Sequence, residues 1–387
     1  MLKKKIENKY ILIVTLIFTI VSLAHCLFYV KSTINMEPFT YDGQNYIACA
    51  KRLLETGQFS FWGKGPDAYV SPVYPMFLAL CMLIFGKGMT GIIAIRFIQS
   101  FMLAFGVGLS CLVVNKLTNN KFALYCTGVF LACNGTFSFY SVLMLTETVC
   151  FFFTMLFINS FIDLIHRASN RRAYLTGLYY ALAVLTRPPI AILIPLFIIA
   201  MFKHTNLKQK LLMLGGFATL VAPWTLRNVI SLKKLVFFST QTNAFFYGFC
   251  QDPLKYNLQD PGTITGNLKL IGRFFKEDPI GELSYMTINK FKQIFLGYDE
   301  IAYSRIDHNF LDYWFRVPFV RLGSLGAIFG LFSKKYRGVS IFCIVFLIAT
   351  FTVIPVVRYG FPFYPFLGMF TGLTISALYK YFVGMKK

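Results

Sequence analysis

Two carboxylates of this chain are candidate functional residues: Asp42 as a base, and Glu147 because a carboxylate within an apolar stretch is costly and usually faces the bundle interior or a cavity. Asp42 lies in the segment 41–46 (YDGQNY), and Glu147 follows the dipeptide LT at the start of a long apolar run. A carboxylate at the start of a helix, as expected for Asp42, stays ionised easily and can accept a proton from a substrate hydroxyl. The structural alternatives are an N-cap for Asp42, which spacing alone favours, and a carboxylate stabilised by the helix dipole for Glu147.

Three arginines form a second group of candidate functional residues. Arg187 lies in the segment TRPP, Arg227 in PWTLRN and Arg358 in VRYG, each at an end of an apolar run. The guanidinium group is planar, donates paired hydrogen bonds and stays charged, so it suits a phosphate. The structural alternative is that each arginine anchors a helix end at the lipid headgroups. That alternative explains any one of the three better than it explains all of them.

The elements that must position these residues are apolar helices. Of the 387 residues, 56% are hydrophobic and 14% are charged, whereas about a quarter of the residues in a soluble domain are charged. We therefore predict an all-α polytopic membrane protein of about ten transmembrane helices. The predicted spans are 10–30, 90–115, 122–138, 142–165, 173–186, 190–202, 211–230, 314–332, 339–356 and 362–382.

The basic residues give these helices an orientation. The segments 1–9, 116–121, 167–172, 203–210, 334–337 and 380–387 hold 18 of the 38 Lys and Arg residues and one acidic residue, Glu7. Cytoplasmic loops carry such an excess. We predict a multi-pass protein of the cell membrane with both termini in the cytoplasm and the candidate site residues on the extracytoplasmic side. The net charge of +22 therefore needs no nucleic-acid partner.

The segment Val73–Phe85 tests this topology. It is apolar, but its 13 residues are too few to cross a bilayer. If it were a span, every later loop would change sides. We predict a helix in the outer interface that begins after Ser71-Pro72 and ends at Gly86.

The predicted organisation has three parts. Residues 1–230 form a catalytic membrane module that includes a first outside loop, 31–89. Residues 231–313 form a large outside loop with an amphipathic helix at 278–296, and residues 314–387 form a three-helix membrane segment. No zinc, EF-hand or nucleotide-binding motif occurs in the sequence. We expect no cofactor; a divalent metal at His308, between Asp307 and Asp312, is a weaker alternative than a solvated loop.

The order of several short motifs resembles a known family. Asp42, SPVYP at 71–75, LTE at 145–147, LTRP at 185–188, PWTLRN at 223–228 and RYGFPFYP at 358–365 look like the bacterial relatives of protein O-mannosyltransferases and aminoarabinose transferases. These are membrane glycosyltransferases of the C fold. The resemblance spans residues 42–366, although Asp42 is followed by Gly43 where many relatives have a second carboxylate.

The resemblance implies transfer of a sugar from a polyprenyl-phosphate carrier to a glycan, lipid or protein acceptor at the outer face of the bilayer. Asp42 would act as general base and give inversion at the sugar carbon, and Arg187, Arg227 and Arg358 would bind the donor phosphate. The polar loop 238–247 offers amides, hydroxyls and aromatic rings suited to a sugar or to the acceptor. The residues predicted to bind substrate are Tyr46, Tyr74, Glu147, Gln241, Asn243, Tyr247 and Tyr359.

Two other classes of function remain open. A flippase or transporter for polyprenyl-linked glycans would need charged groups in mid-span, where Arg96, near the outer end of its span, is the clearest basic residue. A non-catalytic assembly subunit would not need three arginines on one face. Both classes are less consistent with the sequence than a glycosyltransferase.

Overall fold

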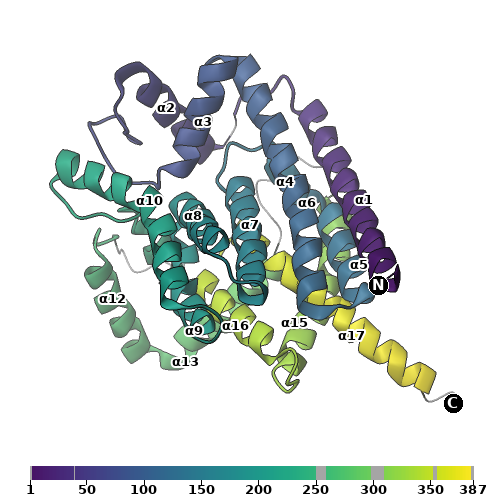
Figure 1. The fold of residues 1–387 in the computed structure, drawn as a ribbon. Helices are drawn as coiled ribbons and strands as arrows, with labels where there is room; N and C mark the ends of the chain where they lie inside the picture. The colour runs from purple at the N-terminus through teal and green to yellow at the C-terminus, as the bar shows by residue number, and fades with distance from the viewer. Residues whose placement is uncertain (1, 39, 250–258, 298–308, 352–354, 385–387) are drawn as a thin grey trace.

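The chain folds into helices in the computed structural model, which describes residues 2–38, 40–249, 259–297, 309–351 and 355–384 (Figure 1). No strand occurs among these residues. The first half contains α1 (Leu2–Ser32), α2 (Tyr41–Thr56), α3 (Val73–Phe85), α4 (Met89–Thr118), α5 (Lys121–Ala132), α6 (Gly135–Phe139), η1 (Tyr140–Val142), α7 (Glu147–His166), α8 (Asn170–Thr186), η2 (Pro188–Leu193), α9 (Ile194–His204) and α10 (Leu207–Leu232). The second half contains α11 (Asn243–Phe249), α12 (Ile264–Glu277), α13 (Pro279–Ser284), η3 (Tyr285–Asn289), η4 (Lys292–Leu296), α15 (Asn309–Gly330), α16 (Arg337–Phe351), η5 (Val357–Phe363) and α17 (Tyr364–Gly384).

Several of these helices can cross a bilayer by length and composition. Among the described residues four helical stretches qualify, namely 7–32, 89–118, 147–166 and 357–384. The pair formed by 121–132 and 135–142, which bends by 56°, makes a fifth if it is one span. The predicted all-α, polytopic membrane class is therefore confirmed. The total of about ten spans also counts shorter or more polar helices, and it stays a prediction.

The helices pack in one continuous arrangement around α4 and α7. The helix α4 packs against α1, α5 and α7; α7 packs against α8, and α8 against α10, while α17 packs against α5 and α15. At the α8–α10 contact the backbones touch, because a Cβ at Gly177 would lie 1.9 Å from the carbonyl oxygen of Met213. Small residues allow such close approach between membrane helices. This arrangement fixes the ends of α7 and α8, which carry Glu147 and Arg187.

The short helices α2 and α3 lie together at one end of the molecule (Figure 1). The helix α3 has the predicted bounds, with Pro72 before it and Gly86 after it. The helix α2 ends at Gly57, whose φ of 67° favours glycine. The short helix predicted at 73–85 is thus confirmed as an element of the fold.

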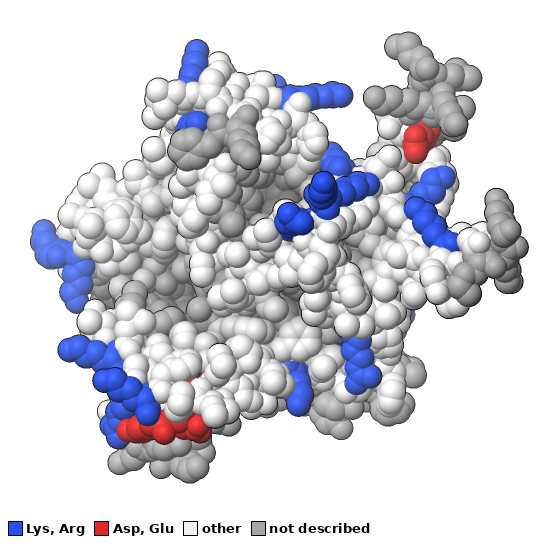
Figure 2. All heavy atoms as spheres, turned by 90° about the horizontal axis from the view of Figure 1, so that it is seen from below, with Lys and Arg blue, Asp and Glu red and all other residues white. Residues whose placement is uncertain are grey.

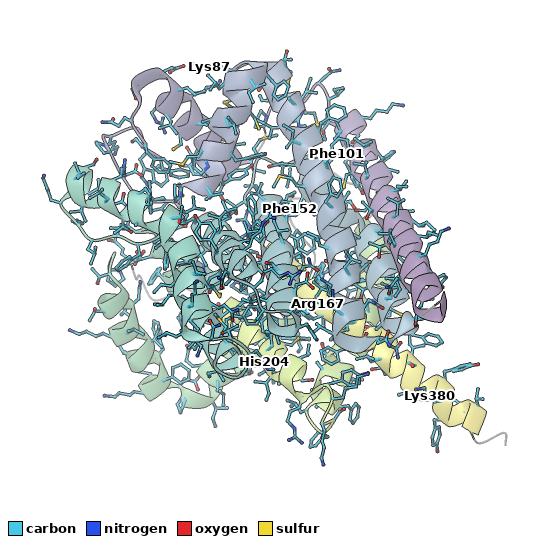
Figure 3. All side chains as sticks on the ribbon, in the orientation of Figure 1. Lys87, Phe101, Phe152, Arg167, His204 and Lys380 are labelled. Carbon is cyan, nitrogen blue, oxygen red and sulfur yellow. The ribbon has the colours of Figure 1, made fainter. Side chains whose placement is uncertain are left out.

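The loops predicted to be cytoplasmic lie away from that end. In Figure 3, Arg167, His204 and Lys380 occupy the lower part of the view, and Lys87 lies at the top beside α2 and α3. On the face seen from below, Lys and Arg are spread widely, whereas the visible Asp and Glu lie near its margins (Figure 2). This arrangement agrees with the predicted grouping of the loops; which side faces the cytoplasm stays a prediction.

The amphipathic segment predicted at 278–296 is helical but broken into α13, η3 and η4. Ile280 and Leu283 are exposed, as a surface helix requires, whereas Ile294 and Phe295 are buried. Lys290 is buried too, and its ammonium group donates a hydrogen bond to the carbonyl oxygen of Phe351. The segment therefore joins the protein core at its second half, rather than presenting one continuous apolar face.

Candidate functional site

A cavity of about 880 Å³ brings together residues that are far apart in the sequence. Its lining comes from α2, the loop 61–71, the start of α7, the end of α8, the segment 235–247 and η5. Residues from all three predicted parts of the chain line it, so the site is not confined to residues 1–230. The cavity contains both candidate carboxylates and two of the three candidate arginines, Arg187 and Arg358.

Asp42 lies in the first turn of α2 and lines this cavity. It is not the N-cap of the helix, because the hydroxyl of Thr40 accepts the hydrogen bond from the backbone N–H of Gly43, at 3.1 Å. The N-cap alternative for Asp42 is therefore wrong. The Asp42 side chain is 50% exposed, so a substrate can reach its oxygens.

Glu147 begins α7 and holds the two arginines of the cavity. Its Oε1 atom lies 2.7 Å from Nη1 of Arg187 and 3.5 Å from Nε of Arg358. The Glu147 side chain is 3% exposed, and no hydrogen-bond partner reaches its Oε2 atom within the described part of the chain. A carboxylate this enclosed serves mainly to orient its partners, because burial of a charge is costly unless it is paired.

Local sequence places each arginine at the cavity. Arg187 ends α8 in an extended conformation (φ −143°, ψ 108°), since Pro188 and Pro189 cannot continue an α-helix. Its guanidinium group lies 4.2 Å from the ring centre of Tyr359. Arg358 lies in η5, the short 3-10 segment that leads into α17, and its Nη2 atom is 3.4 Å from Oδ2 of Asp42.

The charged groups thus form a chain in the order Asp42, Arg358, Glu147, Arg187. The exposed link between Asp42 and Arg358 is long, and exposed ion pairs contribute only about 0–1 kcal/mol. The buried link between Glu147 and Arg187 is short, and breaking such a pair costs about 3–5 kcal/mol. An incoming anion can therefore displace Asp42 from Arg358 while Glu147 keeps both arginines in place.

Four predicted substrate-binding residues besides Glu147 line the cavity: Tyr46, Gln241, Tyr247 and Tyr359. Burial raises the pKa of the Tyr46 phenol, so its hydroxyl keeps its proton and can donate a hydrogen bond. Tyr74 is placed differently: it is fully buried, and its hydroxyl donates to Oε1 of Gln99 at 3.0 Å. Asn243 begins α11, but its side chain is not among the described parts.

Arg227 is not among the residues that line the cavity. It donates to the carbonyl oxygens of Asp67 and Phe59, both at 2.7 Å, and its guanidinium group lies 5.2 Å from the ring of Trp224. The structure therefore separates Arg227 from Arg187 and Arg358 and ties it to the loop that follows α2. A phosphate-binding role for it stays a prediction.

Arg227→Ala tests the role that these contacts indicate. We expect a loss of a few hydrogen bonds, each worth about 1 kcal/mol, and so a melting temperature lower by about 2–6 °C. The affinity for a polyprenyl-phosphate sugar should stay within about twofold, because the charged cavity is unchanged. Arg321→Ala, at an exposed position, is the control. If Arg227→Ala instead binds the polyprenyl-phosphate sugar tenfold more weakly and keeps its melting temperature, Arg227 takes part in binding the phosphate.

The predicted alternative of a metal site involves three residues, of which the structure describes only Asp312. Asp312 accepts hydrogen bonds from the backbone N–H of Gly135, at 2.7 Å, and from the hydroxyl of Thr136, at 2.6 Å. Asp307 and His308 lie outside the described residues. Elsewhere in the described chain, no three His, Cys, Asp or Glu side chains are grouped to hold a metal. The absence of a cofactor stays a prediction.

Sequence reasoning missed the aromatic wall of the cavity. Phe61, Trp62 and Tyr69 all line it, from a loop rich in Gly and Pro. The available signal was the density of aromatic residues in a polar segment between two predicted helices. Phe61 is buried and Tyr69 half-buried, whereas Trp62 is exposed at the cavity, and exposed apolar surface of this kind can mark a binding site.

Comparison with known proteins agrees with the predicted resemblance. Residues 69–226 match the family model described as dolichyl-phosphate-mannose-protein mannosyltransferase. That stretch includes Glu147 and Arg187 but neither Asp42 nor Arg358. No curated protein matches the chain.

Among solved structures, the chain is similar to the crystal structure of ArnT from Cupriavidus metallidurans bound to undecaprenyl phosphate. The TM-score is 0.54 at 12% sequence identity, and the alignment covers 92% of this chain and 60% of that chain. At this identity the similarity shows the fold. Together, the match over residues 69–226 and the shared fold confirm the resemblance of this polytopic membrane chain to the C-fold relatives of the dolichyl-phosphate-mannose-protein mannosyltransferases.

Proposed function

We propose that this protein transfers a sugar from a polyprenyl-phosphate carrier to an acceptor hydroxyl at the extracytoplasmic face of the membrane. The observation that carries the proposal is the placement of Asp42. It is a reachable carboxylate that lies 3.4 Å from Arg358, and Glu147 links that arginine to Arg187. A base and a paired positive charge are the two groups that such a transfer needs.

The proposed reaction is one displacement at the anomeric carbon. Asp42 accepts the proton of the acceptor hydroxyl as its oxygen attacks the sugar. The bond between the anomeric carbon and the phosphate oxygen breaks at the same time, and the bond electrons leave with the lipid phosphate. The donor phosphodiester carries one negative charge and the departing monoester carries two, so Arg358 and Arg187 stabilise charge that develops during the step.

The surroundings of Glu147 favour inversion. Retaining glycosyl transfer through a covalent intermediate uses two carboxylates about 5 Å apart, one as nucleophile and one as acid. Of the described residues that line the cavity, only Asp42 and Glu147 carry carboxylates. Glu147 is enclosed and bound to two arginines, so it is poorly placed for either role. One available base is what a single inverting displacement requires.

The flippase alternative lacks a comparable set of charges within the described spans. Arg96 is 1% exposed, and its guanidinium group donates to the carbonyl oxygens of Thr33, Met36 and Val142. These bonds cap backbone groups between α1, α4 and η1, which is a structural task. The cavity instead brings together Asp42, Glu147, Arg187 and Arg358.

Incubation with a panel of donors tests the proposal. Purified protein in lipid nanodiscs is given polyprenyl-phosphate hexoses and pentoses, together with mixed glycan, lipid and peptide acceptors. We expect release of the free lipid phosphate with at least one donor, at a rate that depends on acceptor concentration. Movement of intact donor across the bilayer of a proteoliposome without such release would instead favour the flippase.

A further inference from the structure

The cavity has an aromatic shelf, which we define as the side chains of Phe61, Trp62 and Tyr69. The ring centres of Phe61 and Tyr69 are 5.5 Å apart in a stacked arrangement, and those of Trp62 and Tyr69 are 5.0 Å apart. Trp62 stays 44% exposed although it is among the largest apolar side chains of the protein. An exposed tryptophan at a cavity wall leaves apolar surface for a ligand to cover.

The loop that carries the shelf, residues 57–72 and here called the shelf loop, is fixed by hydrogen bonds from Asp67 within it and from Arg52 on α2. The carboxylate of Asp67 accepts hydrogen bonds from the backbone N–H groups of Phe61, Trp62 and Tyr69, at 2.7, 3.2 and 3.1 Å. Arg52 donates to the carbonyl oxygens of Ser60 and Phe61, at 2.9 and 2.5 Å. The shelf is therefore preorganised, which lowers the entropy cost of binding a ligand.

The shelf is connected to the helix that carries Asp42. Tyr46 is one helical turn after Asp42 and on the same face of α2. Its ring centre lies 5.3 Å from that of Phe61. Tyr46 thus joins the shelf to the face of α2 that carries the proposed base, and an acceptor on the shelf would share one cavity with Asp42, Arg187 and Arg358.

Neutral polar groups face the same space. The segment 239–242 (STQT) and Thr263 line the cavity with hydroxyl and amide groups. The backbone N–H of Thr240 donates to the carbonyl oxygen of Ala68 at 2.7 Å, which fastens this segment to the shelf loop. The cavity thus combines flat apolar rings with uncharged hydrogen-bonding groups.

We propose that the aromatic shelf is the acceptor subsite and that the acceptor is a carbohydrate. This inference rests on the proposed function and names the class of its second substrate. A pyranose ring has an apolar C–H face that covers an aromatic ring, and a rim of hydroxyl groups that bond to Ser, Thr and Gln side chains. An extended peptide would bind by backbone hydrogen bonds, but several backbone groups of residues 59–69 are already bonded to Arg52, Asp67, Arg227 and Thr240.

Saturation-transfer NMR with short saccharides tests the subsite without any donor. The probes are cellotriose, maltotriose, chitotriose and mannotriose, with a Ser/Thr-rich hexapeptide as the competing class. We expect at least one trisaccharide to bind the purified protein, Trp62→Ala to weaken that binding at least tenfold, and Trp62→Phe to restore part of it. Trp314→Ala is the matched control, because Trp314 is exposed on α15 and lies outside the cavity lining.

The results of this experiment separate failure of the carbohydrate subsite from failure of the proposed function. Three results would overturn the carbohydrate subsite. They are no binding of any saccharide, saccharide binding that Trp62→Ala leaves unchanged, and binding of the hexapeptide alone that depends on Trp62. A melting temperature measured for each variant separates loss of the shelf from loss of the fold. Saccharide binding without any release of lipid phosphate in the donor panel would overturn the proposed function instead, so the two failures are distinguishable.

Discussion

Asp42→Asn should lower the rate of sugar transfer by about 10³-fold, within the range that a general base contributes. The amide has nearly the same shape as the carboxylate but cannot take the proton of the acceptor. Donor affinity should change little, because the lipid chain and the arginines provide most of that binding. The exposed Asp42–Arg358 pair contributes little stability, so the melting temperature should stay within about 2 °C. Transfer rate and donor affinity are measured on the same preparation.

Glu55→Gln is the matched control for this variant. Glu55 also lies on α2 and is 53% exposed, but its carboxylate pairs with Lys87 at 3.0 Å, outside the cavity lining. It should transfer sugar at the wild-type rate. If Asp42→Asn does the same, Asp42 is not the base and the strongest assignment at this site is wrong.

Glu147→Gln should have the second-largest effect, on both stability and transfer. The change removes the negative charge between Arg187 and Arg358, so these two guanidinium groups lose their shared, buried carboxylate partner. Loss of one member of a buried ion pair costs about 3–5 kcal/mol. We expect a melting temperature lower by several degrees and a transfer rate lower by about 10²-fold, since the arginines no longer hold the phosphate in one geometry.

A double substitution separates the positioning role of Glu147 from substrate binding. The double variant Glu147→Gln/Arg187→Gln lacks both charges of the pair. It should be more stable than Glu147→Gln alone, because no unpaired guanidinium group remains at position 187. Glu147→Asp, which keeps the charge, should keep more activity than Glu147→Gln. Additive losses of stability in the double variant would show that the pair at 2.7 Å is not coupled.

The sequence predicted the elements of the fold better than the pairing of their side chains. The length of the apolar run at 73–85, with Pro72 before it and Gly86 after it, was sufficient to predict α3, because local signals set its ends. The segment 278–296 was harder. Its apolar spacing suggested one surface helix, but the segment is divided into α13, η3 and η4, its end packs on α15 and η5, and Lys290 is buried with a hydrogen bond to Phe351 of α16.

The same distinction holds for the site. Charge type and position along the chain were sufficient to select Asp42, Glu147, Arg187 and Arg358, which the structure brings together at one cavity. The partner of each group depends on contacts between distant segments, and spacing does not report these. Sequence alone could not show that Thr40 caps α2, or that Arg227 bonds to the shelf loop. The aromatic shelf was missed because no periodic pattern marks a loop.

The anomeric configuration of the product tests the account most directly. A donor of known configuration that supports release of lipid phosphate is incubated with the protein, and the new glycosidic bond is assigned by NMR from its one-bond C–H coupling. One displacement assisted by Asp42 predicts a product of inverted configuration, with no sugar covalently attached to the protein at any step. Retention of configuration, or a glycosyl ester trapped on Asp42, would contradict it.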